Sequence, residues 1–129
     1  MKKPLFLLLL ILSFTLLKAQ QAAPKAEEPQ LKQYFFVMLS RGAYQDQDKE
    51  TLRNLQNGHM AHMQQMANAG KLNIAGPFAD NGQWRGIWIF KTESIEETKL
   101  LVEQDPMVKA GRLKYEIHPW WSQKGAKLD

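Results

Sequence analysis

The sequence predicts one small α+β domain whose elements follow the order β-α-β-β-α-β. Three observations predict it: short apolar runs of strand length, two segments with apolar residues at helical spacing, and an Asn-Gly step between two of the strands. Apolar periodicity and turn residues are the primary sequence signals of these elements. Residues 31–129 are enough for one hydrophobic core and too few for two.

The first half of the domain predicts a strand, a long helix and a second strand. The strand is Tyr34–Leu39, which is apolar on both faces and therefore covered on both sides of its sheet. A polar loop over 42–48 follows it. The helix spans 49–69, with apolar residues at helical spacing and Gly70 placed to cap its C-terminus. The second strand covers 72–78.

The second half opens with Asn-Gly at 81–82, a pair typical of a tight hairpin turn. The Trp- and Ile-rich run 83–91 is then the third strand. Ser94 starts the second helix, with a glutamate three residues later in place for a capping box. This helix ends near the Asp-Pro step at 105–106, because proline resists continuation. Alternating residues over 113–118 predict the last strand, which completes a ferredoxin-like arrangement.

The sheet of such a fold has helices on one face only. Yet the first and third predicted strands are apolar on both faces. Something must therefore bury the second face, and a second copy of the same sheet is the simplest candidate. We expect a homodimer.

The N-terminus has the three parts of an export signal. Lys2 and Lys3 supply the positive start, 5–12 is an unbroken apolar run, and Ala19 offers a small residue for cleavage. The apolar run is shorter than the roughly 20 residues of a membrane span. We expect residues 1–19 to be removed as a signal peptide and the mature protein to be periplasmic or secreted, with no membrane contact after cleavage. The alternative is an uncleaved N-terminal anchor.

The rest of the chain divides into three parts. Residues 20–32 are rich in Gln, Ala, Glu and Pro and predict a flexible tether. Residues 33–122 form the folded domain, and 123–129 are a C-terminal tail. Removal of the signal peptide lowers the formal net charge from +4 to +1, because that segment carries three lysines and no acid. A nearly neutral protein gives no support for nucleic-acid binding, and the absence of cysteine excludes thiol chemistry.

His59 is the first candidate functional residue. At 100° per residue it lies in the middle of the apolar stripe of helix 49–69, where an unpartnered imidazole would be costly to desolvate. Two interpretations stay open at this point. His59 is either a core histidine satisfied by a backbone carbonyl or a functional one.

Seven short motifs occur in a fixed order between Tyr34 and Trp121: Gly58-His59-Met60, Ala69-Gly70-Lys71-Leu72, Ala75-Gly76-Pro77-Phe78, Ser94-Ile95-Glu96-Glu97, Asp105-Pro106-Met107-Val108, Ala110-Gly111 and His118-Pro119-Trp120. Together they resemble the YCII-related proteins, over nearly the whole mature domain. The resemblance implies a dimeric ferredoxin-like α+β barrel. It also implies a pocket with a histidine and an aspartate that act as an acid–base pair.

Carried onto this chain, the histidine is His59 and the aspartate is Asp105. A carboxylate beside an imidazole fixes its tautomer and suits it to general acid–base work. Asp105 also has a simpler interpretation, because an acid before proline often only fixes a turn. Many relatives carry arginine three residues before the histidine, where this chain has Gln56. If that arginine binds an anion, this protein takes a less charged ligand.

The same helix offers a soft-metal site as the alternative. Imidazole and thioether groups suit Cu(I), although methionines at helical spacing usually pack in cores. The candidate ligands are His59, His62, Met63 and Met66. His62 lies at the edge of the stripe, where we expect it to contact solvent.

The tryptophans fit a core or a dimer interface better than an aromatic pocket: Trp84, Trp88, Trp120 and Trp121.

These observations predict an exported dimer that performs acid–base chemistry on a small organic molecule, by isomerisation, elimination, or lyase- or dehydrochlorinase-type proton transfer. No phosphate loop, dinucleotide fingerprint or hard-metal cluster occurs in the sequence, so no cofactor is implied. The alternative is a dimer that binds a small ligand or Cu(I) without catalysis.

Overall fold

Four antiparallel strands form one sheet in the order β2-β3-β1-β4. This computed structural model describes residues 28–129, so the predicted signal peptide (1–19) and most of the predicted tether (20–32) lie outside the described residues. The elements are β1 (Leu31–Arg41), α2 (Lys49–Asn68), β2 (Leu72–Pro77), β3 (Trp84–Phe90), α3 (Ile95–Glu103), α4 (Pro106–Lys109) and β4 (Leu113–Gln123). Their order and the sheet topology confirm the predicted ferredoxin-like arrangement.

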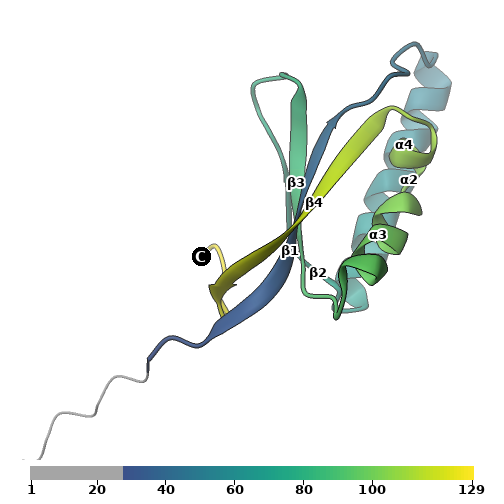
Figure 1. Cartoon of the computed structure of the whole chain (residues 1–129). Coiled ribbons are helices and arrows are strands. Elements are labelled where there is room, and N and C mark those ends of the chain that lie inside the picture. The colour runs from purple at the N-terminus through teal and green to yellow at the C-terminus, as the bar shows by residue number, and fades with distance from the viewer. Residues whose placement is uncertain (1–27) are drawn as a thin grey trace, which may run out of the picture.

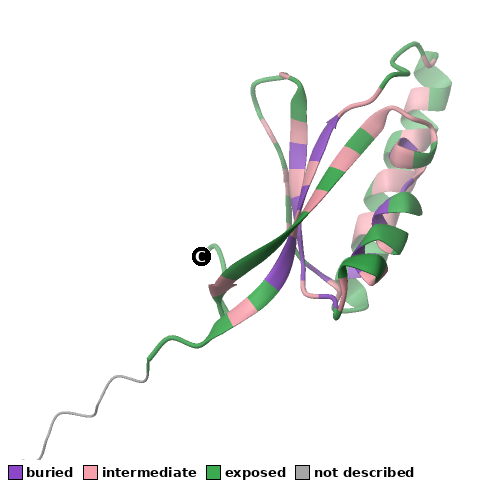
Figure 2. Ribbon diagram, in the orientation of Figure 1, coloured by how far each residue is buried: buried purple, intermediate pink, exposed green. Residues whose placement is uncertain are grey.

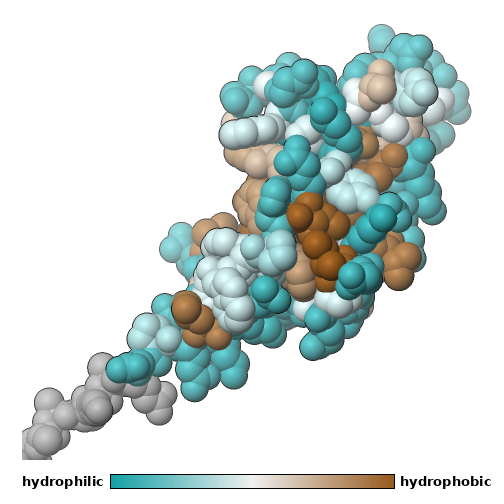
Figure 3. Space-filling model, viewed as in Figure 1, coloured by the Kyte–Doolittle hydropathy of each residue, from teal (hydrophilic) through white to brown (hydrophobic). Residues whose placement is uncertain are grey.

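The three described helices lie on one side of the twisted sheet (Figure 1). Buried residues concentrate on β1, on β3 and on the sheet-facing sides of the helices (Figure 2). Figure 3 shows apolar side chains gathered where the sheet meets the helices, with polar side chains around them. The core consists of Phe35, Val37, Leu39, Met66, Leu72, Trp88, Phe90 and Val102. It fixes the distance between α2 and the strands that face it.

Helix α2 begins and ends as the sequence predicts. The Asp48 side chain accepts a hydrogen bond from the Thr51 N–H, which satisfies one unpaired donor of the first turn. Gly70 follows the last turn with φ +71°, a left-handed conformation that glycine adopts without strain. The next N–H, of Lys71, donates to the Met66 carbonyl. These caps fix where α2 begins and ends.

The first and last strands, β1 and β4, are longer than predicted. The predicted runs were Tyr34–Leu39 and 113–118, whereas β1 and β4 pair from Leu31 opposite Gln123 to Arg41 opposite Leu113. The residues added at one end, Ser40 and Arg41, are polar, and those added at the other end (31–33 and 119–123) mix polar and apolar residues. They join the sheet through backbone pairing that a hydrophobic pattern does not report. The turn after β2 is also longer than a two-residue hairpin. It spans residues 78–83, with φ +55° at Asn81.

The second helical region differs from the expectation at one point. The helix that starts at Ser94 ends at Glu103, as predicted, but Pro106 then begins the four-residue helix α4. Proline suits the first position of a helix because its missing N–H would have no partner there. Asp105 is the N-cap of α4, which places its side chain against this turn.

Two polar contacts hold α3 against its neighbours. Lys71 Nζ lies 2.6 Å from Glu97 Oε1, and this hydrogen bond holds the pKa of Glu97 below its usual range. The Tyr115 hydroxyl of β4 donates to Glu103 Oε1 at 2.7 Å. Burial, with this hydrogen bond, raises the pKa of Tyr115 to about 12. The two contacts hold α3 against the start of β2 and against β4.

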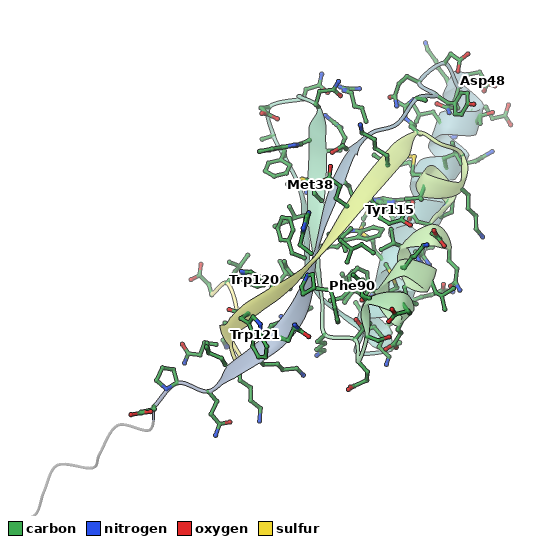
Figure 4. The ribbon with its side chains drawn as sticks, viewed as in Figure 1. Met38, Asp48, Phe90, Tyr115, Trp120 and Trp121 are labelled. Carbon is green, nitrogen blue, oxygen red and sulfur yellow. The ribbon has the colours of Figure 1, made fainter. Side chains whose placement is uncertain are left out.

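The other face of the sheet carries no helix of the described chain (Figure 1). Met38 of β1 lies opposite Ile87 of β3, and Figure 4 shows Met38 on the side away from the helices, whereas Phe90 and Tyr115 point toward them. Residues after β4 fold back here, since the Gly125 N–H donates to the Tyr34 hydroxyl at 3.4 Å.

No helix within residues 28–129 has the length and apolarity to cross a membrane.

Candidate active site

A cleft of about 830 Å³ lies between α2 and the sheet. Its volume is in the range of small-molecule sites in proteins. One wall is a face of α2, and the other is formed by the last residues of β1 and β2, the first part of β3 and the start of β4. Its apolar part includes Leu39, Leu52, Met60, Met63 and Trp88. This surface can hold the body of a small organic molecule.

His59 and Asp105 meet at the wall of this cleft. They are 46 residues apart in the sequence, and His59 Nδ1 lies 2.8 Å from Asp105 Oδ2. The histidine side chain is 12% exposed and the aspartate side chain is fully buried. The pair that the family resemblance implied is therefore in direct contact.

The Asp105 carboxylate has two tasks at once. Its Oδ1 accepts hydrogen bonds from the Met107 N–H at 2.9 Å and the Val108 N–H at 3.2 Å. Through Oδ1, Asp105 fixes the turn at the start of α4, as its simpler interpretation stated. Its other oxygen, Oδ2, contacts His59. An ionised carboxylate only accepts hydrogen bonds, so the hydrogen between the two residues belongs to His59 Nδ1.

The second ring nitrogen of His59 faces the cleft. Nε2 has no hydrogen-bond partner among residues 28–129, and no buried side-chain nitrogen or oxygen there lacks a partner. Nε2 therefore reaches the solvent of the cleft that His59 lines. With Nδ1 carrying the hydrogen, Nε2 presents a lone pair that can accept a proton and later return it.

Trp88 holds the plane of the imidazole. The two rings stack with centroids 5.5 Å apart and planes 21° apart, and Trp88 is 1% exposed. The indole N–H donates to Met63 Sδ at 3.1 Å. Trp88 was predicted as core or interface, and it is both a core residue and a wall of the cleft. Trp84, Trp120 and Trp121 are exposed.

Gly58 allows α2 to approach α4 closely enough for this contact. A Cβ at position 58 would lie 2.9 Å from Pro106 Cγ, closer than real Cβ atoms come to a neighbour. Glycine inside a helix normally costs about 1 kcal/mol relative to alanine. The close approach explains why glycine stands beside His59 despite this cost.

We expect Gly58→Ala to lower the melting temperature, although alanine is the better helix former. The added methyl group would push Pro106 and Asp105 away from α2 and weaken the His59–Asp105 hydrogen bond. Thermal unfolding of Gly58→Ala checks this expected loss of stability. It is compared with thermal unfolding of Ala61→Gly, which makes the reverse change on an exposed part of α2. A Gly58→Ala protein that melts higher than the wild type would show that the approach is not tight.

The expectation for His62 was wrong. Its Nε2 lies 2.7 Å from the Leu101 carbonyl oxygen instead of facing solvent. Leu101 lies in the last turn of α3, where carbonyl groups have no partner within the helix, so His62 satisfies one of them.

The soft-metal alternative gains no support from the described residues. His59 and His62 each contact another residue, Met63 accepts the hydrogen bond from Trp88, and Met66 is 2% exposed in the core. No group of three or more His, Asp or Glu side chains within residues 28–129 is placed to hold a metal ion.

One feature of the cleft was not predicted from the sequence. Five cationic side chains line it together with Gln56: Arg41, Lys49, Arg53, Arg85 and Arg112. They come from α2, from two strands and from the segment before β4, so no local motif signals them. Only the folded topology brings them to one cavity.

The family model of the YCII-related domain matches residues 34–121 of the sequence. This chain belongs to the YCII-related family. The match includes residues of all four strands and both members of the His59–Asp105 pair, so their contact lies inside the family domain.

The solved structure of muconolactone isomerase shares the fold of this YCII-related domain. Muconolactone isomerase aligns with a TM-score of 0.58 and 14% identity, over 74% of this chain and 96% of that chain. The 5-chloro-2-hydroxyhydroquinone dehydrochlorinase TftG from Burkholderia phenoliruptrix AC1100, in complex with 2,5-dihydroxybenzoquinone, aligns with a TM-score of 0.48 and 21% identity, over 67% of this chain and 92% of that chain. No curated protein matches the sequence.

Proposed function

We propose that this YCII-related domain catalyses cofactor-free proton transfer on a small organic molecule. His59 is the general base and acid, and Asp105 is the residue that positions it. The observation that carries the proposal is the 2.8 Å contact from His59 Nδ1 to Asp105 Oδ2, which leaves Nε2 facing a cleft of suitable size.

The proposed step begins with the Nε2 lone pair taking a proton from a substrate carbon next to a carbonyl group. The electron pair of that C–H bond stays on the substrate as an enolate, and the imidazole becomes an imidazolium. Return of the proton to a different carbon completes an isomerisation. In an elimination, the same electron pair expels a leaving group such as chloride, and the imidazolium later releases its proton to water. Asp105 stabilises the imidazolium through Nδ1–H.

Deuterium incorporation from D₂O tests this step without knowledge of the natural substrate. We would incubate the protein with a panel of small carbonyl compounds that carry an acidic C–H and follow loss of the proton signal by NMR. General acid–base groups contribute about 10²–10⁴-fold, so His59→Gln is expected to lose exchange by that factor. His118→Gln is the matched control, because His118 is exposed on β4 and outside the cleft.

Exchange by wild type and His118→Gln, but not by His59→Gln, is the expected result. If the wild type exchanges no compound faster than His59→Gln does, the domain is a ligand-binding module without catalysis.

We also propose that the domain works outside the cytoplasm. Support comes from the charged start, the apolar run and Ala19 at the N-terminus. The intact mass of the protein recovered from the exported fraction of the producing cell is expected to correspond to a chain that starts at Gln20 or Gln21. A mass that includes Met1 would contradict cleavage.

A homodimer through the face of the sheet without helices is the third part of the proposal. Met38 and Ile87 lie side by side on this face, and both are only half-buried in the single chain. Met38→Glu would place a charge in an apolar interface and is expected to give a folded monomer. Light scattering coupled to size-exclusion chromatography measures the mass, with Ala61→Glu on an exposed part of α2 as the control. A monomeric wild type would contradict the dimer.

A further inference from the structure

The arginines of this chain have an uneven distribution. All four line the cleft of His59: Arg41, Arg53, Arg85 and Arg112. Of the described lysines, only Lys49 joins them, and no described aspartate or glutamate lines the cleft. Arginine is the side chain that best matches the geometry of carboxylate and phosphate groups, because its planar fork binds two oxygens at once.

Three of these five cations are positioned by neutral groups: Arg41, Arg85 and Arg112. Within residues 28–129 none of the five lies within 4.0 Å of a carboxylate. Arg112 Nη1 donates to the Gln47 side-chain oxygen at 2.7 Å and to the Gln45 carbonyl at 3.1 Å. Arg41 Nε donates to the Gly82 carbonyl at 3.1 Å. The protein fixes the direction of these side chains without neutralising their charge.

Two guanidinium groups converge on a single neutral oxygen. Arg41 Nη2 lies 2.8 Å and Arg85 Nη1 lies 3.0 Å from Asn81 Oδ1. Two like charges so close repel each other, and an amide oxygen offsets this repulsion only weakly. An anion between or beside them would offset it more strongly, because it carries a full negative charge. Concave walls of one sign of charge also concentrate the opposite charge from solution.

We propose that the cleft binds a small organic oxyanion, a carboxylate or a phosphate monoester, with an apolar body. This inference rests on the proposed function for the role of His59 and adds the class of substrate. The charged group binds at the arginines, and the apolar body lies along Leu39, Met60 and Trp88 with its acidic C–H at His59 Nε2. Charge that develops on the substrate as the proton leaves is stabilised by the same cations.

The residue at position 56 fits this view. Gln56 replaces an arginine of many relatives, which led to the expectation of a less charged ligand. Gln56 does line the cleft, but the four arginines and Lys49 line it too. The lost charge at one position therefore leaves a strongly cationic site.

Three probes of similar size test the inference: benzoate, phenyl phosphate and neutral benzyl alcohol. The readout is the NMR signal of the Trp88 indole N–H, which lies at the cleft wall. Benzoate, phenyl phosphate or both are expected to bind at least about tenfold more tightly than benzyl alcohol, because bonds between charged partners are about twice as strong as neutral ones. Binding of the anions is expected to weaken several-fold from about 20 mM to about 500 mM NaCl.

Arg53→Gln is the main variant. Arg53 is exposed and makes no hydrogen bond or ion pair with another residue in the described part of the chain. Loss of its charge is therefore not expected to disturb the fold. We expect it to weaken anion binding about fivefold or more, and the double variant Arg53→Gln/Arg85→Gln to weaken it further. Lys109→Gln removes the same charge from an exposed position outside the cleft and is expected to bind as the wild type does.

The preferred probe distinguishes a carboxylate site from a phosphate site. Equal binding of benzyl alcohol and both anions, or wild-type affinity in the double variant, would overturn the inference. Binding is measured without turnover. The experiment can therefore refute the proposed substrate class without refuting the proposed catalysis, and the reverse also holds. Anion binding without any deuterium exchange refutes only the catalytic proposal, whereas exchange of neutral compounds without anion binding refutes only the substrate class.

Discussion

Asp105→Asn is expected to fold normally and to lose almost all proton transfer. The asparagine oxygen can still accept from the Met107 and Val108 N–H groups and so retain the cap of α4. The amide nitrogen that then faces His59 is a donor, so Nδ1 must become the acceptor and the ring hydrogen moves to Nε2. A histidine base with the wrong tautomer loses on the order of 10⁴-fold in rate. Deuterium exchange and the melting temperature, measured on the same sample, separate the two effects.

Asp105→Ala provides the comparison for this variant. It removes the cap, which costs about 1 kcal/mol, and it leaves His59 Nδ1 without its partner, which costs about 1–3 kcal/mol. We therefore expect Asp105→Ala to be less stable than Asp105→Asn and equally inactive. An Asp105→Asn protein with wild-type exchange would mean that Asp105 only fixes the turn.

Trp88→Ala is expected to cause the largest loss of stability. Trp88 is 1% exposed, stacks on His59 and contacts Phe90 edge to face. Large-to-small changes of buried aromatic residues cost about 3–5 kcal/mol, out of a total of about 5–15 kcal/mol for a typical domain. The free energy of unfolding from urea titration measures the change.

Trp88→Phe separates the packing of Trp88 from its hydrogen bond. Phenylalanine keeps an aromatic ring beside His59 and loses the N–H that contacts Met63. We expect a loss of about 1–3 kcal/mol and a folded, active protein. If Trp88→Ala were as stable as the wild type, the ring would not support the imidazole in the way described.

The fold was predictable because its signals are local. Ser94 and Gly70 mark helix ends through side-chain capping and backbone conformation, and both effects act within a few residues. The short helix at Pro106 was missed because four residues are too few to show a period. His62 was misplaced because its partner, the Leu101 carbonyl, becomes available only where α3 packs beside α2.

The site was predictable in part, and for a different reason. His59 was noticeable as a polar residue on an apolar helix face, but Asp105 entered through the resemblance to a family. The cationic wall was not predictable, because Arg41, Arg85 and Arg112 are scattered along the chain and each looks like an ordinary surface residue. Only sheet topology reveals that they share one cavity.

The tautomer of His59 decides whether Asp105 holds this histidine as a base. Long-range ¹H–¹⁵N NMR correlations of the ring distinguish a protonated nitrogen from an unprotonated one in the neutral imidazole. We expect hydrogen on Nδ1 and a free Nε2 in the wild type, with the reverse in Asp105→Asn. A wild-type His59 with its hydrogen on Nε2, or an identical pattern in both proteins, would contradict a base held by Asp105.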